Sequence, residues 1–321
     1  MKKVSAKKVS SMLPVLSAEA NKYTRGTCEL IVGSERYPGA GVLASLAANA
    51  AGAGYTRVYT CRETAFAIRL LQPSTVIAAL GEFLQDRHES ADGHPLAVVM
   101  GCGVECASEN GRPFDPAVRN SQFLLDALEA VRAPVVVDGG GLNALMCNRA
   151  SEVLATRRAC GYPTVITPHR GEAARLAEYA LFEANAVPEE GVERASEEIR
   201  AAVEKMPADE LALLIASSFA SVCVLKGPDT FIAAPDAALD DVRVMREGTA
   251  VLAKAGTGDV LAGMIGSLLA QGCDALDAAC AGTYLHALAG HKAMTEQGVS
   301  CVRTEDVLKC IPAAFREVLG W

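Results

Sequence analysis

The sequence predicts a single α/β domain built as a three-layer sandwich, in which helices cover both faces of a mainly parallel central sheet. Short apolar runs alternate with longer helical patterns along most of the 321 residues, and such alternation is typical of a parallel sheet. Hydrophobic residues make up 50% of the chain and aromatic residues only 5%, a balance that suits helices packed closely on a sheet. No internal repeat or composition shift indicates a second domain.

The elements of the first half follow the order strand, turn, helix. Residues 29–32 form a short apolar run that Gly33 ends, and residues 41–51 form a helix of small side chains that ends at Gly52. The alternation then continues along the chain. It predicts strands at 56–60, 96–100, 134–137 and 164–167, and helices at 63–71, 116–131 and 171–179.

The second half is richer in helix. Residues 190–205 are amphipathic and highly charged, which predicts a helix with an exposed face. Residues 221–225 and 230–233 are expected to pair as a hairpin around a Gly-Pro-Asp turn. Three further helices are expected after the hairpin, at 257–271, 275–295 and 304–318.

Charge and hydropathy exclude several classes of protein. The net charge is -8 and the basic cluster consists of four lysines within the first eight residues, so we expect no nucleic-acid partner. No apolar run reaches the ~18–20 residues of a membrane span, and no signal-peptide core follows the lysines. We therefore expect a cytoplasmic protein whose eleven cysteines are buried, reduced thiols. Residues 1–25 are interpreted as a mobile or loosely docked tail, and residues 26–321 as the domain.

The turn Gly256-Thr257-Gly258-Asp259 is the first candidate for chemistry. Its glycines allow a tight turn into a helix, whose free amides and dipole attract phosphate. Asp259 could cap that helix or take a proton from a substrate hydroxyl, and spacing alone favours the cap. A second turn, at residues 226–230, offers a lysine and exposed amides to phosphates. This second turn keeps the catalytic interpretation open.

Other polar residues follow predicted strands, where open α/β sheets place ligands. His169 could contact a ligand or simply have a backbone partner, and Gly101 and Gly103 could admit a ligand or mark a sharp exit from the sheet. Asp138 could position a hydrated magnesium ion or cap the next helix, and the cap is favoured. His286 lacks the spacing of a zinc motif and is expected to pack or to face solvent. Walker A and Rossmann glycine motifs are both missing.

Taken together, the segments GSERYPGAG, AVVMGCG, PVVVDGGGLNAL, TPHRGE, VLKGPDTF and KAGTGDVLAG resemble the ADP/ATP-dependent NAD(P)H-hydrate dehydratases. The resemblance spans residues 33–272 and continues into the closing helices. It implies a ribokinase-like fold without a separate lid domain. It also implies a repair reaction, in which a hydrated nicotinamide cofactor is dehydrated to NADH or NADPH with consumption of a nucleotide.

The resemblance assigns roles to residues of both turns. Asp259 would deprotonate the ring hydroxyl for attack on the terminal phosphate of the nucleotide, and the amides of residues 256–258 would stabilise the transferring group. Nucleotide contacts would be Lys226, Gly227, Pro228, Asp229, Thr230, Gly256, Thr257 and Gly258. Contacts to the hydrated cofactor would be Ala40, Gly103, His169 and Asp259.

The resemblance also implies partners. ADP or ATP would donate the phosphoryl group, Mg²⁺ would bridge its phosphates, and no protein residue is assigned as a metal ligand. A homotetramer and a separate epimerase protein are expected. The rival hypotheses are a ribokinase-like kinase of a small hydroxylated metabolite and a non-catalytic nucleotide sensor.

Three positions depart from the pattern of the family. Cys102 stands where proline is common, Gly140 stands where a second acidic residue is common, and Ala255 stands where glycine is common. Alanine at 255 is expected to stiffen the phosphate turn.

Overall fold

A ten-stranded sheet forms the centre of the computed structural model, which describes residues 1–91, 93–106, 116–185 and 192–320. The strands lie in the order β1-β10-β9-β8-β7-β6-β5-β2-β3-β4. Neighbours pair in parallel except β8 with β9 and β9 with β10. The strands are β1 (Lys2–Lys3), β2 (Thr27–Ile31), β3 (Tyr55–Thr60), β4 (Val76–Ala79), β5 (Leu96–Met100), β6 (Val135–Val137), β7 (Thr164–Ile166), β8 (Val222–Leu225), β9 (Thr230–Ala233) and β10 (Arg243–Met245).

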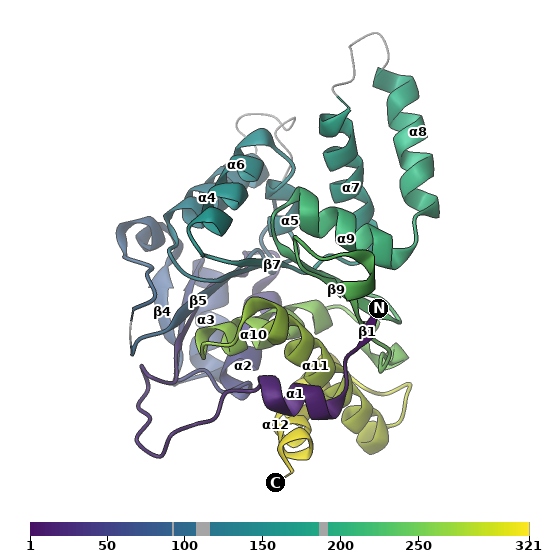
Figure 1. Ribbon diagram of the computed structural model, residues 1–321. Coiled ribbons are helices and arrows are strands. Elements are labelled where there is room, and N and C mark those ends of the chain that lie inside the picture. Colours follow the sequence, from purple (N-terminus) through teal and green to yellow (C-terminus); the bar gives the residue numbers. More distant parts are fainter. Residues whose placement is uncertain (92, 107–115, 186–191, 321) are drawn as a thin grey trace.

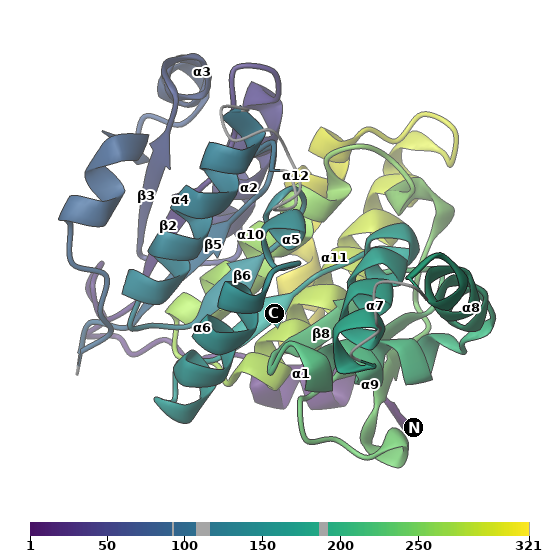
Figure 2. The same cartoon turned by 90° about the horizontal axis from the view of Figure 1, so that it is seen from above.

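Helices cover both faces of this sheet, as Figures 1 and 2 show. One face carries α1 (Ala6–Met12), α2 (Pro38–Ala50), α3 (Arg62–Leu71), α10 (Thr257–Ala270), α11 (Ala275–Gln297) and α12 (Thr304–Leu319). The other carries α4 (Pro116–Ala130), α5 (Gly141–Ala144), α6 (Asn148–Ala159), α7 (Arg170–Ala184), α8 (Val192–Lys205) and α9 (Ala208–Ser218). The predicted three-layer architecture with a mainly parallel sheet is confirmed.

Alternation along the strands divides the core into two apolar layers. In β2, Leu30 packs with the α10 layer and Ile31 with the α4 layer, and in β5 the neighbours Val99 and Val98 divide in the same way. Successive side chains of a strand point to opposite faces, so a strand buried on both faces appears in the sequence as a continuous apolar run. This is why the central strands were recognisable.

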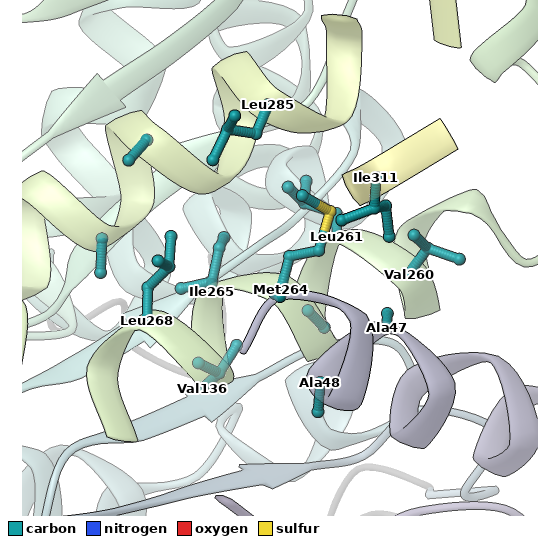
Figure 3. Close-up of a cluster of buried hydrophobic side chains, with 14 of the residues drawn as sticks. Ala47, Ala48, Val136, Val260, Leu261, Met264, Ile265, Leu268, Leu285 and Ile311 are labelled. Atoms are coloured by element: carbon teal, nitrogen blue, oxygen red, sulfur yellow. The ribbon is translucent and has the colours of Figure 1, made fainter. Parts of the chain in front are cut away.

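Helix α10 occupies the middle of one layer and is buried from Val260 to Ala270. Its side chains contact α2, α11 and the sheet (Figure 3). Small residues allow the close approach, since a Cβ added to Gly263 would lie 2.2 Å from Ala44 O and one added to Gly266 would lie 2.1 Å from Val99 Cγ2. The residues at the start of α10 are therefore held in place by a helix that the core fixes on all sides.

The elements expected from the sequence are present, with ends displaced by a few residues. Residues 190–191 of the expected helix 190–205 lie outside the described residues, and α8 is described from Val192. Elements that the sequence did not predict are β1, β4, β10, α1, α6 and α9. Six of the eleven cysteines are buried, as expected, whereas Cys61, Cys106 and Cys273 are half-buried and Cys160 and Cys301 are exposed.

The N-terminal segment differs from the expected loose tail. Strand β1 pairs in parallel with β10, and α1 packs against α11 and α12. Val4, Val9 and Leu13 are buried in the same core layer as α10. Their apolar spacing, interrupted by lysines and serines, carries too weak a signal to predict docking from sequence. Residues 2–13 are therefore part of the packed structure.

The chain contains no described helix that is both long and apolar enough to cross a lipid bilayer.

A buried charged network lies beneath β2 and β3. His88 Nδ1 lies 2.5 Å from Glu29 Oε2, its Nε2 lies 2.7 Å from Phe83 O, and its ring stacks on Phe83. Because both ring nitrogens face acceptors, the arrangement suits an imidazolium, which donates from both nitrogens. Burial lowers the pKa of His88, but the bonds to Glu29 and Phe83 outweigh it, and the pKa is raised above its ordinary value.

This network predicts a pH dependence of stability. Because the pKa of His88 is higher in the folded than in the unfolded state, its contribution is fully present below the unfolded value, about 6.5, and is lost as pH rises through the folded value. We expect the free energy of unfolding, measured in urea, to decrease over this range. In His88→Gln that decrease should be smaller. An unchanged pH dependence in His88→Gln would assign it to other groups.

Candidate active site

The carboxyl ends of four adjacent parallel strands meet at one edge of the sheet. Gly101 follows β5, Asp138 follows β6, His169 follows β7 and Lys226 follows β8. A bridge between His169 and Lys226 continues the pairing of β7 and β8. Open α/β sheets place ligands at such an edge, and the sequence brings four polar or glycine-rich loops to it.

A cavity of about 530 Å³ opens beside these strand ends. Seven residues that the sequence assigned to ligand binding line it: His169, Lys226, Gly227, Pro228, Thr230, Thr257 and Gly258. Its other walls are mostly apolar and come from β10, α10, α11 and the 3₁₀ helix η4 (Ala250–Leu252). Asp229 does not line the cavity and forms an ion pair with Arg246, at 3.7 Å. The cavity has a polar end at the start of α10 and an apolar remainder.

The turn before α10 has the geometry of an anion site. Gly256 precedes the helix with φ of 90°, a left-handed conformation that favours glycine. Thr257 Oγ1 donates to Leu252 O at 2.7 Å and to Lys254 O at 2.9 Å, which fixes the turn. The first intrahelical bond runs from Val260 N to Gly256 O, so the amides of Gly258 and Asp259 precede it and point out of the helix start.

Asp259 does not cap this helix. The N-cap residue is Gly256, and no side chain caps the helix start. Asp259 lies in the first turn instead, where a carboxylate interacts favourably with the helix dipole. The interpretation as a cap, which spacing alone favoured, is therefore wrong, and the side chain remains available for chemistry.

Asp138 and Lys226 form a buried ion pair below the turn. Lys226 Nζ donates to Asp138 Oδ1 at 2.8 Å, and Thr167 Oγ1 donates to the same oxygen at 2.6 Å. Burial raises the pKa of Asp138, but the charge of Lys226 outweighs it and the pKa is lowered. Burial lowers the pKa of Lys226, but the charge of Asp138 outweighs burial, and the pKa is raised above its ordinary value. Asp138 therefore stays a carboxylate, and the expectation that it caps the following helix is wrong.

Asp259 lies close to this pair and to a thiol. One ligand atom of each of Asp259, Asp138 and Cys102 lies within 4.8 Å of the other two. Burial, and then the charge of Asp138, raise the pKa of Asp259 to about 7. Cys102 Sγ lies 3.8 Å from Asp138 Oδ2, and burial raises the pKa of this thiol well above its ordinary value. At neutral pH a large fraction of Asp259 is ionised and can accept a proton.

His169 has a structural partner and also faces the cavity. Its Nδ1 accepts from Gly171 N at 3.1 Å and from Glu172 N at 3.3 Å, so it caps α7. His169 N in turn donates to Glu172 Oε2 at 2.8 Å. The side chain is 59% exposed and lines the cavity. The backbone partners are therefore present, and contact of His169 with a ligand stays a prediction.

Ala40 and Gly103, the remaining residues assigned to the substrate, lie next to each other. Gly103 has φ of 66°, and a Cβ added there would come 2.5 Å from Ala40 Cβ. The loop after β5 thus lies directly on the start of α2. Neither residue lines the cavity, so together they form a separate wall beside the strand ends.

His286 is a cavity residue to which the sequence assigned no ligand. It is 6% exposed, and it lines the cavity beside Thr283. Its Nε2 has no hydrogen-bond partner among the residues that the structure describes. Burial, and then the charge of Lys226, lower the pKa of His286 to about 4, so the ring is neutral. A histidine in the middle of a long helix gives no sequence signal of this position.

Gly140 shows why the second acidic residue of the family pattern is missing. A Cβ at this position would lie 1.7 Å from Val104 O, so the loop after β5 occupies the space of a side chain. Any side chain at 140 requires that loop to move.

We therefore expect Gly140→Ala to lower the free energy of unfolding by about 1–3 kcal/mol or more, as overpacking does. Gly81→Ala is the matched control, because no atom lies within 4 Å of a Cβ added there. Urea unfolding of both variants measures the difference. Equal stability of the two variants would mean that the loop yields without cost.

Comparison with known proteins is consistent with this site. The family model for NAD(P)H-hydrate dehydratase matches residues 28–313. The ADP-dependent (S)-NAD(P)H-hydrate dehydratase of Xanthomonas campestris is 34% identical over 279 residues, which cover 86% of this chain and 83% of that protein. The bifunctional NAD(P)H-hydrate repair enzyme Nnr of Thermofilum pendens is 30% identical, and the match covers 95% of this chain and 52% of that protein.

Solved structures resemble the whole chain. The ADP/ATP-dependent NAD(P)H-hydrate dehydratase of Bacillus subtilis, co-crystallised with ATP and Mg²⁺, has a TM-score of 0.73 and 25% identity, over 99% of this chain and 98% of that one. A ribokinase-like superfamily protein of Enterococcus faecalis has a TM-score of 0.72 and 20% identity, over 99% and 96% of the two chains. The predicted ribokinase-like fold is thereby confirmed.

Proposed function

The chain belongs to the NAD(P)H-hydrate dehydratase family, and from this membership we propose that its cavity dehydrates hydrated NADH and NADPH with consumption of ADP or ATP. The enzyme is then a nucleotide-dependent hydro-lyase. The observation that carries the proposal is the position of Asp259, in the first turn of α10, beside the free amides at the helix start and within reach of the charge of Lys226. A base, an anion site and a cation meet there, as phosphoryl transfer requires.

Asp259 is the proposed catalytic base. Its carboxylate takes the proton of the ring hydroxyl, and the resulting oxygen attacks the terminal phosphorus of the nucleotide. The bond from that phosphorus to the bridging oxygen breaks, and the shortened nucleotide leaves. The C–O bond to the phosphate then breaks, phosphate being a better leaving group than hydroxide, and the adjacent ring carbon loses a proton, so that the C=C bond of the dihydronicotinamide ring is restored.

The nucleotide is proposed to lie in the cavity with its phosphates at the start of α10. The free amides of Gly258 and Asp259 face the anion there, whereas Thr257 N donates to Lys254 O, and Lys226 adds a positive charge. Gly227, Pro228 and Thr230 form the adjoining wall, and the apolar remainder of the cavity suits a base. Asp229 does not line the cavity and is paired with Arg246, so it is proposed to hold the neighbouring residues of this wall in place.

The hydrated cofactor is proposed to approach Asp259 from the side of Ala40, Gly103 and His169. A Cβ at position 103 would collide with Ala40, so this position requires glycine. Because glycine has no side chain, a ring can approach the backbone closely. The exposed His169 borders the cavity. Such an arrangement places the two ligands on either side of the carboxylate.

Mg²⁺ is proposed to enter with the phosphates of the nucleotide. Mg²⁺ prefers an octahedron of oxygen ligands and retains several waters. The described residues nearest the phosphate turn offer two carboxylates and a thiol, and one carboxylate already accepts from Lys226 and Thr167. This set of ligands does not fit a magnesium site held by the protein alone.

The assembly and the partner enzyme are also proposals. We propose a homotetramer, supported by the family resemblance, with α2 packed inside each subunit against α10. Size-exclusion chromatography with light scattering tests this state. We also propose that a separate epimerase protein supplies the epimer that the site accepts. Adding such an epimerase should increase the final yield of NADH from a mixture of epimers.

The decisive experiment supplies the purified protein with hydrated NADH, Mg²⁺ and either ADP or ATP. Regenerated NADH, followed by its absorbance, is the expected result with at least one donor. Nucleotide consumption without NADH would support a kinase of another metabolite, and nucleotide binding without turnover would support a sensor. Absence of NADH with both donors would reject the dehydratase.

A further inference from the structure

A thiol and two carboxylates meet at the point where the sheet edge reaches α10. One ligand atom of each of Cys102, Asp138 and Asp259 lies within 4.8 Å of the other two. The three residues come from three separate segments: the loop after β5, the end of β6 and the first turn of α10. The sheet and the buried helix therefore hold them together.

Their spacing is close to that of ligands around a tetrahedral ion. Zinc binds thiolate sulfur at about 2.3 Å and carboxylate oxygen at about 2.0–2.2 Å, so its ligand atoms lie roughly 3–4 Å apart. Cys102 Sγ already lies 3.8 Å from Asp138 Oδ2. Asp259 offers a carboxylate oxygen within 4.8 Å of both, so a tetrahedral ion drawn to the cluster would have three protein ligands and a fourth position for water.

The charges of the cluster also favour a divalent cation. Lys226 and Thr167 bond to Oδ1 of Asp138, so its Oδ2 remains on the side of Cys102. The charge of Lys226 acts on Asp259, but the ammonium itself is bonded to Asp138. With a thiolate at Cys102, the cluster would carry three negative charges, and Lys226 would offset only one of them. A divalent ion neutralises this excess.

The chemistry of the donors selects the class of ion. Thiolate is a soft ligand that zinc and its neighbours prefer, whereas magnesium takes oxygen. We propose that Cys102, Asp138 and Asp259 form a binding site for a thiophilic divalent metal ion of the zinc class, and that the bound ion inhibits the enzyme by occupying the carboxylate of Asp259. The inhibitory part rests on the proposed function, and the binding part does not. Binding releases the proton of the Cys102 thiol to solvent.

Cobalt(II) tests the binding, since it follows zinc in its ligands and reports a thiolate ligand by a charge-transfer absorption in the near ultraviolet. Titration of the full-length protein with Co²⁺ alone should produce this band and saturate at one ion per chain. Cys102→Ser should abolish the band. Cys106→Ser, which removes a half-buried thiol from the same loop, is the matched control and should keep it.

A second variant keeps the test independent of the thiol. Asp259→Asn removes one ligand without removing sulfur, so the band should persist while the affinity for Co²⁺ falls by about 10–100-fold, by analogy with losses around metal sites. A missing band in the unaltered protein would overturn the proposal. So would a band that survives Cys102→Ser, or an unchanged affinity in Asp259→Asn.

The inhibition is measured in the NADH-regeneration assay with excess Mg²⁺. Micromolar Zn²⁺ should suppress the rate, and a chelator should restore it. Cys102→Ala should keep a larger fraction of its own zinc-free rate at the same zinc and nucleotide concentrations. Equal suppression in that variant would overturn the inhibition. If no NADH forms even without zinc, the proposed function fails, and the cobalt titration still decides the site.

Discussion

Replacing Asp259 by asparagine should lower the rate of NADH regeneration by about 10²–10⁴-fold, the usual loss when a general base is removed. The amide has nearly the shape of the carboxylate but cannot take the proton of the ring hydroxyl. Nucleotide binding should change little, because the amides at the start of α10 and the ammonium of Lys226 remain. Steady-state kinetics and nucleotide titration by calorimetry measure the two effects separately.

The matched control is Asp274→Asn. Asp274 caps α11 by accepting from Leu276 N and Asp277 N, and asparagine caps a helix about as well. This variant should keep its rate. Near-normal turnover in Asp259→Asn would contradict the assignment of the base, and it would leave Asp259 only the favourable interaction with the helix dipole.

Replacing Lys226 by methionine should lower both stability and nucleotide affinity. Asp138 is 3% exposed and has Lys226 as its ion-pair partner. Removing one partner of a buried pair typically costs about 3–5 kcal/mol, because the other charge is left without compensation. Nucleotide binding should weaken as well, since the cation beside the phosphate turn is lost. Urea unfolding and calorimetric titration report the two losses.

A double variant separates these roles. In Lys226→Met with Asp138→Asn, the uncompensated carboxylate is replaced by a neutral amide, so part of the stability should return. The nucleotide affinity should stay low, because the cation is still missing. If stability does not recover, the pair is not the main function of Lys226 in the fold. If affinity recovers, Lys226 acts on the nucleotide only through Asp138.

The pairing of Asp138 with Lys226 could not be predicted from the sequence. Each follows an apolar strand, but 88 residues separate them, and only the order β6-β7-β8 brings their strands near each other. The sequence contains the strands and not their order. A local interpretation of Asp138 therefore favours a helix cap, although the N-cap residue of the following helix is Gly140 and Asp138 pairs with Lys226 instead.

The parts predicted well are those with a local signal. The turn before α10, the position of Asp259 in that turn and the turn of Lys226 belong to contiguous motifs whose glycines and flanking apolar runs are visible in the sequence. His286 and Cys102 have no such motif. Their positions depend on which helix lies over which strand end, and that is decided by packing of the two core layers.

The docking of the first strand and helix has a consequence for how the chain folds. Residues 2–13 pair with β10 and pack on α11 and α12. More than two hundred further residues must therefore be synthesised before these partners are available. The contact from Lys2 to Asp241, for example, spans 239 positions. Contacts of such long range form slowly. Valines and a leucine that are buried at the end of folding are thus exposed throughout its earlier stages, when the growing chain is most prone to aggregate.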